Sequence, residues 1–324
     1  MPAALRPGRA SASWPVAAGL AAGVAADLLL ADPRRGHPVA GFGAVAAAAE
    51  RAVHRDSRLA GTAYAVVLTG AAAALGRVVE RSLPGSLPTA GATALATWAV
   101  VGGTSLRREA HEMSRLLEAG DLDAARQRLS HLCGRDPAGL DEAGLARATV
   151  ESVAENTSDA VVGPLVWGAI GGVPGLLAYR AVNTLDAMVG HRSPRYERFG
   201  WAAARADDVA NLVPSRVAAG LASGLAPVVG GRARSAVRVW QRDGHKHPSP
   251  NAGPVEAAFA GALSRTLGGR LSYGGRVEER PLLGDGPAPG LHDIARAARL
   301  SGAVTAGAAA LAVGGRLLVD RARR

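Results

Sequence analysis

The chain has 324 residues, of which 48% are hydrophobic, 20% are charged and only 4% are aromatic, so it forms one large domain or two ordinary ones. A single cysteine, Cys133, excludes a disulfide scaffold, and abundant alanine with few aromatic residues disfavours an all-β protein. The formal net charge of +10 comes almost wholly from arginine, since Lys246 is the only lysine. Because the basic residues are dispersed, we expect no nucleic acid as a partner, but an anionic membrane surface or anionic substrates.

Stretches without any charged side chain predict membrane-spanning helices. They cover residues 10–26, 61–76, 82–106, 160–179 and 300–315. A helix needs about 20 apolar residues to cross the hydrocarbon core of a bilayer. With their apolar flanks, four of these stretches predict spans near 10–30, 59–79, 86–106 and 298–319. The alternative, buried helices of a soluble bundle, stays open because alanine contributes little to membrane insertion.

Arginine residues orient the predicted spans. The connections after the first and third spans are rich in arginine, whereas the link between the second and third has only Arg77 and Arg81. The positive-inside rule therefore places both rich connections in the cytoplasm. Their arginines are Arg34, Arg35, Arg51, Arg55 and Arg58 after the first span, and Arg107, Arg108, Arg115, Arg126, Arg128, Arg135 and Arg147 after the third. We predict a cytoplasmic helical region over 107–158.

The apolar segment 160–182 contains Pro164, Gly171, Gly172 and Pro174 near its middle. If it crossed the membrane, the arginine-rich segment that follows would lie outside, against the positive-inside rule. We therefore predict a broken or re-entrant segment, which is tolerated where the backbone is buried in protein or lines a cavity. The segment 212–231 is interpreted likewise, and the alternative in which both cross stays open.

The predicted fold class follows from these elements. It is all-α: one polytopic integral membrane domain spanning 1–324, with a helical and loop region in the cytoplasm that carries the active site. We expect a multi-pass protein of the cell (inner or plasma) membrane.

Polar residues that point to chemistry concentrate in four blocks, of which the first is 27–39. Its Asp27 lies inside the apolar run, where an unpaired carboxylate is costly. The second block holds Glu151, Glu155 and Asp159, whose i, i+4, i+8 spacing places three carboxylates along one helix face. Such charges repel one another unless a cation gathers them, and Mg²⁺ prefers oxygen ligands. A solvated acidic face is the alternative, but the adjoining apolar segment favours a site.

The third block, 183–211, combines acids, amides and arginines. Asn183 and Asp186 share a helix face at i, i+3, and Arg205, Asp208 and Asn211 do the same on the next helix. Guanidinium groups in the intervening loop suit phosphate or carboxylate oxygens, which they bind in pairs. The alternative for Arg205 is an ordinary surface pair with Asp208.

The fourth block, 243–256, is an irregular loop before an apolar helix predicted at 255–267. Gly253 permits close approach of a ligand to the backbone, and Lys246 beside two histidines can contact a phosphate. The glycines at 268–269 and 274–275 are interpreted as loop residues.

At these blocks the sequence resembles the CobD/CbiB family, the adenosylcobinamide-phosphate synthases of cobalamin biosynthesis. The middle string is the most specific, and His245 departs from the basic residue expected in many relatives. The matching strings are 27–39; 151–159 with Gly163-Pro164-Leu165; 179–216 with Asn183-Thr184-Leu185-Asp186 and Phe199-Gly200-Trp201; and His247-Pro248-Ser249-Pro250-Asn251 with Gly253.

The resemblance implies a bacterial membrane ligase. It joins a carboxyl group of adenosylcobyric acid to the amine of (R)-1-amino-2-propanol phosphate, or of the free amino alcohol, and gives adenosylcobinamide phosphate. ATP and Mg²⁺ are the implied cofactors, because a carboxylate forms an amide only after activation as an acyl phosphate. The implied partners are the corrinoid, the amino-alcohol phosphate and membrane lipid. A homo-oligomer, or a complex with other corrinoid-pathway membrane enzymes, is left open.

Resemblance and chemistry together assign roles as hypotheses. The catalytic residues are Glu155, Asp186 and Asp208. The metal ligands are Glu151, Glu155, Asp159, Asp207 and Asp208. The substrate- or phosphate-binding residues are Arg195, Arg205, Lys246, Asn156, Asn183, Asn251 and His247. The competing interpretation is a transporter or a corrinoid-binding scaffold without catalysis, in which an acid such as Asp27 lines a substrate path. The gathering of acids, amides and arginines on one side of the membrane favours the enzyme.

Overall fold

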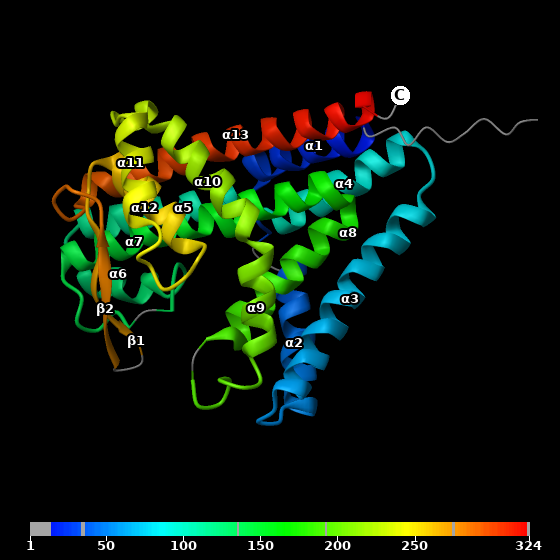
Figure 1. The fold of residues 1–324 in the computed structure, drawn as a ribbon, viewed down its shortest axis with the longest axis horizontal. Coiled ribbons are helices and arrows are strands. Elements are labelled where there is room, and N and C mark those ends of the chain that lie inside the picture. The colour runs from blue at the N-terminus through cyan, green and yellow to red at the C-terminus, as the bar shows by residue number, and fades with distance from the viewer. Residues whose placement is uncertain (1–13, 34–35, 135, 192, 274–275, 323–324) are drawn as a thin grey trace, which may run out of the picture.

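The computed structural model describes residues 14–33, 36–134, 136–191, 193–273 and 276–322. Residues 10–13 of the first predicted span, Arg34, Arg35 and Arg135 of the connections, Arg192 of the third block and the glycines at 274–275 lie outside the described residues. The described chain is mostly helical (Figure 1). Its elements are α1 (Trp14–Leu30), α2 (Pro38–Val53), α3 (Arg58–Ser82), α4 (Ser86–Val100), α5 (Gly103–Glu118), α6 (Leu122–Leu129), α7 (Glu142–Thr157), the π-helix η1 (Ser158–Val162), α8 (Gly163–Leu185), the π-helix η2 (Asp186–Gly190), α9 (Trp201–Ala210), α10 (Leu212–Gly224), the 3₁₀ helix η3 (Ala226–Val229), α11 (Ala233–Asp243), α12 (Ala252–Leu263), β1 (Leu267–Tyr273), β2 (Arg276–Leu283) and α13 (Leu291–Ala322).

Among the described residues, three helices are long and apolar enough to cross a membrane, which indicates a membrane protein. They cover Arg58–Ser82, Glu142–Gly190 and Leu291–Leu318. The predicted span 59–79 falls within the first of them, and the predicted span 298–319 overlaps the last as far as Leu318. The described parts of α1 and α4 have 17 and 15 residues. At 1.5 Å per residue they are about 26 and 22 Å long, less than the roughly 30 Å of a hydrocarbon core. The helix expected over 86–106 ends at Val100, because the chain turns at Val101 and Gly102 before α5 begins.

α1 and α4 lie against each other through small residues (Figure 1). Gly19 and Gly23 stand one turn apart on α1, and each faces a threonine of α4, Thr93 or Thr97. A Cβ at Gly19 would lie 2.5 Å from Thr93 Cβ, so a larger residue would push the helices apart. Such small-residue spacing allows close approach of transmembrane helices.

The segment 160–182 reverses direction at Gly172. There φ is 62° and ψ is −144°, a conformation that glycine adopts without the steric cost of a Cβ. The two legs of the resulting hairpin face each other, with Gly163 against the Tyr179 ring and Gly168 against Leu176. The second leg leads to η2 and α9 (Figure 1). The break expected among the prolines and glycines therefore lies at Gly172.

Two charged side chains hold the tip of this hairpin. Glu80 Oε1, near the end of α3, accepts a 3.1 Å hydrogen bond from Val173 N, the start of the second leg. Arg316 Nη1 of α13 donates a 3.2 Å bond to Ala169 O, the end of the first leg. An acid at a helix N-terminus and a base at a C-terminus both complement the helix dipole. Early and late parts of the chain therefore meet at this tip.

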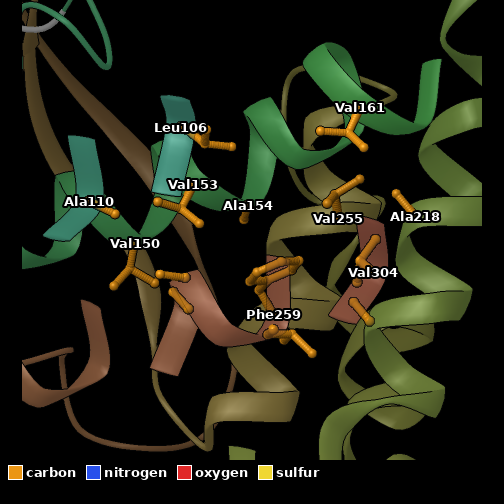
Figure 2. Packing of buried hydrophobic residues seen from close by; sticks show 14 of the residues in the cluster. Leu106, Ala110, Val150, Val153, Ala154, Val161, Ala218, Val255, Phe259 and Val304 are labelled. Carbon is orange, nitrogen blue, oxygen red and sulfur yellow. The ribbon is translucent and has the colours of Figure 1, made fainter. Parts of the chain in front are cut away.

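The main core lies where α5, α7, α10, α12 and α13 converge. Phe259 of α12 is fully buried and lies among Val153 of α7, Val304 of α13 and Ala218 of α10 (Figure 2). Every residue of α12 is buried, which explains its apolar character on all sides. A smaller cluster around Phe199 joins α2, α3, the end of α8 and α9.

A two-stranded hairpin departs from the all-α prediction. β1 pairs antiparallel with β2, and the register shifts between Leu267 and Gly269. Gly268 and Gly269 have φ of 88° and 86°, so these glycines form a bulge in a strand rather than a loop. The helix expected to reach 267 ends at Leu263, because Ser264 takes the left-handed conformation.

Candidate functional site

Five carboxylates from the second and third blocks act on one another electrostatically. We call Glu155, Asp159, Asp186, Asp207 and Asp208 the acidic cluster. Asp159 interacts with Asp207, Glu155 and Asp186, and Asp186 also interacts with Asp208. α7, η1, η2 and α9 supply these residues. Asp159 and Asp186 lie in π-helical segments, which are frequent at functional sites. The structure brings these acids within electrostatic range of one another, whereas the sequence spacing predicted regular helix at both places.

Asp207 is the best-anchored member of the acidic cluster. Asn183 Nδ2 donates to its Oδ1 at 3.3 Å, and Asn211 Nδ2 donates to its Oδ2 at 3.0 Å. Burial raises the pKa of Asp207 to about 6, and the charges of Asp208 and Glu155 act in the same direction. The two amide donors lower the pKa and only partly offset the burial. Asp207 therefore exchanges protons close to neutral pH.

Tyr179 and Asn211 fix the position of this acid. The Tyr179 hydroxyl donates to Asn211 Oδ1 at 2.7 Å and lies 3.1 Å from Asp159 O. Because Asn211 Oδ1 accepts this bond, its amide nitrogen must face Asp207. The contact also joins α8 and η1 to the turn after α9.

A buried arginine lies beside the acids. Arg180 interacts electrostatically with Asp159 and with Asp32 of the first block, and its Nη1 lies 3.4 Å from Asn183 Oδ1. Its Nε is buried and has no hydrogen-bond partner among the described residues. A buried guanidinium donor without a partner is costly, and it suits an anionic ligand.

Asp32 places part of the first block close to Arg180 and η1. It lies next to Gly102, whose N donates to Ala160 O of η1 at 3.1 Å. Its Oδ1 is 3.2 Å from His37 Nε2. Asp27 has a different place, because its Oδ2 accepts from both N and Oγ1 of Thr104 at 3.0 Å and so caps α5.

Close approach of backbone positions Asp186. A Cβ at Gly190 would overlap with Asp186 Oδ1, so only glycine leaves room for this carboxylate at the end of η2. No local pattern singles out Gly190.

The donor set of the acidic cluster suits Mg²⁺ in chemistry, since carboxylates are hard oxygen ligands. Within the part of the chain that the structure describes, no three His, Cys, Asp or Glu side chains are close enough to hold a metal by themselves. Mg²⁺ commonly takes one or two carboxylates together with substrate phosphates and water. The residues present therefore fit a Mg²⁺ that arrives with a phosphate ligand.

Two predicted site residues of α7 have structural contacts. Glu151 is 1% exposed, and its Oε1 accepts a 2.6 Å bond from Gly268 N of β1. Asn156 Nδ2 donates to Ser152 O at 2.9 Å and lies 3.5 Å from Leu132 O. Glu151 thus anchors β1 to α7, and Asn156 anchors the segment before α7. The structure does not place Glu151 with the ligands predicted for the metal.

Both predicted arginines make ion pairs. Arg195 Nη2 donates to Glu50 Oε1 of α2 at 2.7 Å, and Arg205 Nη1 donates to Asp208 Oδ2 at 3.2 Å. More than half of each arginine side chain is exposed. Arg205 borders the acidic cluster as its surface pair, whereas Arg195 joins the 193–199 turn to α2.

The fourth block is held together by its own polar contacts. Lys246 Nζ donates to buried Asp243 at 2.6 Å, and the Arg242 guanidinium beside it holds the pKa of Asp243 well below its usual range. His247 is buried, with Nε2 2.6 Å from Arg280 Nη1 of β2 and 3.9 Å from Glu256 Oε1.

Asn251 joins the fourth block to the third. Its Nδ2 donates to Asp208 O at 2.8 Å, and its Oδ1 accepts from Arg216 Nη1 at 2.8 Å and from Ser215 Oγ at 3.1 Å. The Asn251 side chain, which was predicted to bind phosphate, therefore links α9 and α10 to the start of α12.

Several site residues went unassigned from the sequence although they lie within the strings of the resemblance. They are Asp32, Tyr179, Arg180, Asn211 and Arg216. Arg180 stands beside Asn183 at i, i+3, the one pattern that could have pointed to it.

Comparison with known proteins gives one family. The family described as CobD/Cbib protein matches residues 20–301. A protein of Mycobacterium tuberculosis (strain CDC 1551 / Oshkosh) is 55% identical over 307 residues, 95% of this chain and 97% of its own. Proteins of Rhodobacter capsulatus and Geobacter metallireducens are 43% and 44% identical over 86% and 80% of this chain, and over 91% and 83% of their own. All three are named cobalamin biosynthesis protein CobD. No solved structure matches the chain significantly.

Proposed function

Since the chain belongs to the CobD/CbiB family and so takes part in cobalamin biosynthesis, we propose that it is the ligase that makes adenosylcobinamide phosphate. It joins adenosylcobyric acid to (R)-1-amino-2-propanol phosphate through an amide bond, with ATP and Mg²⁺. Both small substrates and ATP carry negative charges, so their binding site must combine cations with metal ligands.

The observation that carries the proposal is the acidic cluster beside Arg180. Carboxylates in one buried place repel one another, and their burial is favourable only when a cation joins them. The unpartnered Nε of Arg180 needs an acceptor, which a phosphate or carboxylate oxygen provides. Carboxylates that favour a cation, beside a guanidinium that favours an anion, together suit a metal-bound phosphate.

Asp159 and Asp208 are the residues we propose to hold Mg²⁺ together with the phosphates of ATP, because Mg²⁺ commonly takes one or two carboxylates beside phosphates. The metal would neutralise phosphate charge, and ATP would activate the carboxyl group of the corrinoid. Arg180 binds an oxygen of the anionic substrates. Glu155 and Asp186 complete the acidic cluster around them.

Asp207 is suited to take the proton that the amine loses as the amide bond forms. A general base is most effective when its pKa lies near the working pH, and that of Asp207 is about 6. Asn183 and Asn211 hold both carboxylate oxygens through one bond each, so lone pairs remain for the amine proton.

We also propose that the site faces the cytoplasm. Asp32 follows α1 and Gly102 follows α4, and both lie at Ala160 of η1. The ends of two predicted spans therefore meet at the site, on the side that the arginine count assigns to the cytoplasm.

The test is incubation of the purified protein with adenosylcobyric acid, aminopropanol phosphate and Mg-ATP. We expect adenosylcobinamide phosphate and ADP in equal amounts. Asp186→Asn and Asp208→Asn should lower the rate by at least about 100-fold, since they remove charge from the acidic cluster. Asp123→Asn, at an acid of α6 whose side chain is 89% exposed, is the matched control and should keep the rate.

Two results would contradict the proposal. Corrinoid binding without any turnover by the wild type would favour a scaffold or carrier. Wild-type rates in both variants would show that the acidic cluster is not the site of the reaction.

A further inference from the structure

A cavity of about 470 Å³ lies beside the fourth block, outside the acidic cluster. Helices α10 and α11, the loop between α11 and α12 and the first turn of α12 line it. Its volume falls within the range of small-molecule sites. The lining residues are Arg216, Trp240, Gln241, Gly244, His245, His247, Pro248, Pro250 and Pro254.

The lining combines flat apolar surface with positive charge. Trp240 and three prolines supply the apolar part, whereas Arg216 and His245 supply the polar part. None of the nine lining residues is a carboxylate. A ligand that uses both parts has an aromatic ring, which stacks on an indole, and a negative charge, which pairs with a guanidinium.

Arg216 connects this cavity to the acidic cluster. Its Nη1 donates to Asn251 Oδ1 at 2.8 Å, and Asn251 Nδ2 donates to Asp208 O at 2.8 Å. Asn251 is 7% exposed and accepts from Ser215 as well, so it holds the guanidinium in one orientation. A ligand with its ring in the cavity and its charged tail beside Arg216 lies next to the helix that carries Asp207 and Asp208.

We propose that the cavity binds the adenosine part of ATP, with the base against Trp240 and the phosphates at Arg216. The inference rests on the proposed function and names the place of one substrate. The amino-alcohol phosphate has no ring that would use Trp240. The corrinoid carries a corrin ring in addition to its adenosyl group and is larger than the nucleoside.

The experiment follows binding of a non-hydrolysable ATP analogue with Mg²⁺ to the full chain in detergent. Tryptophan fluorescence reports contact with Trp240, and equilibrium dialysis reports affinity. We expect saturable quenching in the wild type and in the control Trp14→Phe, because Trp14 lies at the start of α1. Trp240→Phe should lose most of the quenching. Arg216→Gln keeps a donor for Asn251, so the fold is retained, and it should weaken binding by about 10-fold or more.

The outcomes separate this inference from the proposed function. If the wild type makes product only with ATP, while neither variant changes quenching or affinity, the cavity is not the nucleotide site and the proposed reaction stands. If the wild type binds no nucleotide, both are wrong. If aminopropanol phosphate quenches Trp240 and the ATP analogue does not, the cavity takes a different anion and the inference fails.

Discussion

Replacing Asp207 by asparagine should stabilise the metal-free protein while it abolishes the reaction. The pKa of Asp207 is about 6, against an ordinary value of 3.8. At about 1.4 kcal/mol per pKa unit, the ionised carboxylate lowers the free energy of unfolding by about 3 kcal/mol. The folded state holds the proton more tightly than the unfolded state does. This contribution therefore becomes less favourable as pH rises from about 4 to about 6 and is constant above that.

The substitution also has a cost. Asn183 and Asn211 each donate to one oxygen of Asp207, and an amide at 207 can accept only one of these bonds. The lost bond costs about 1 kcal/mol. The net gain above pH 6 is then about 2 kcal/mol, or roughly 4 °C in Tm for a chain of this size. Below pH 4 only the cost remains, and the variant should be slightly less stable than the wild type.

The assay is thermal unfolding in detergent with EDTA at pH 8 and pH 4. Asp123→Asn serves as the control, since the Asp123 side chain is 89% exposed. This replacement should change the Tm at pH 8 and at pH 4 by no more than about a degree. Mg²⁺ added together with a non-hydrolysable ATP analogue should stabilise the wild type. A lower Tm for Asp207→Asn at pH 8, or the same Tm difference at both pH values, would refute the reasoning.

Four further results are expected. Gly190→Ala should displace Asp186 and lower the rate of amide synthesis by at least about 10-fold. Gly220→Ala, with open space around it, should keep the wild-type rate. Equal rates in the two variants would contradict the role of the contact between Gly190 and Asp186. Gly172→Ala should lower stability by about 1–3 kcal/mol through backbone strain at its positive φ, and its Cβ would also crowd Glu80 Oε1. Gly171→Ala, one residue away with nothing within 4 Å, should not lower stability; the Tm difference between the two variants decides. Asn251→Ala removes three hydrogen-bond contacts and should lower the free energy of unfolding in urea by about 2–4 kcal/mol. An unchanged urea midpoint would contradict its role in holding α9, α10 and α12 together. In a Cys133→Ser background, Ser86→Cys should react with an impermeant maleimide in intact cells and Gly36→Cys only after permeabilisation, and the reverse pattern would invert the topology.

The candidate site was predictable where local patterns and the family strings carry it. The acids of the second and third blocks meet because the 160–182 segment breaks where its glycines and prolines predicted, so the second leg returns Asp186 towards Asp159. The i, i+4, i+8 spacing of Glu151, Glu155 and Asp159 was less informative, because a regular helix does not continue through η1.

Long-range contacts explain what the sequence could not show. Glu151 accepts a hydrogen bond from Gly268, a residue 117 positions away, and no local pattern predicts that pair. The hairpin of β1 and β2 was missed because its glycines are typical of loops, yet two of them form a bulge at positive φ. Asp27 looked like a substrate-path residue, but Thr104 makes it a cap for α5.

The clamp at the hairpin tip sets an order of events during synthesis. Glu80 and the two legs leave the ribosome well before Arg316, which completes the contact at Ala169. Chains emerge from the N-terminus onwards, so the C-terminal end of the first leg lacks this contact until Arg316 has been made. The second leg carries Arg180 and Asp186 into the site. Completion of the hairpin that carries the proposed site therefore follows synthesis of α13, which supplies Arg316 at the opposite end of the hairpin.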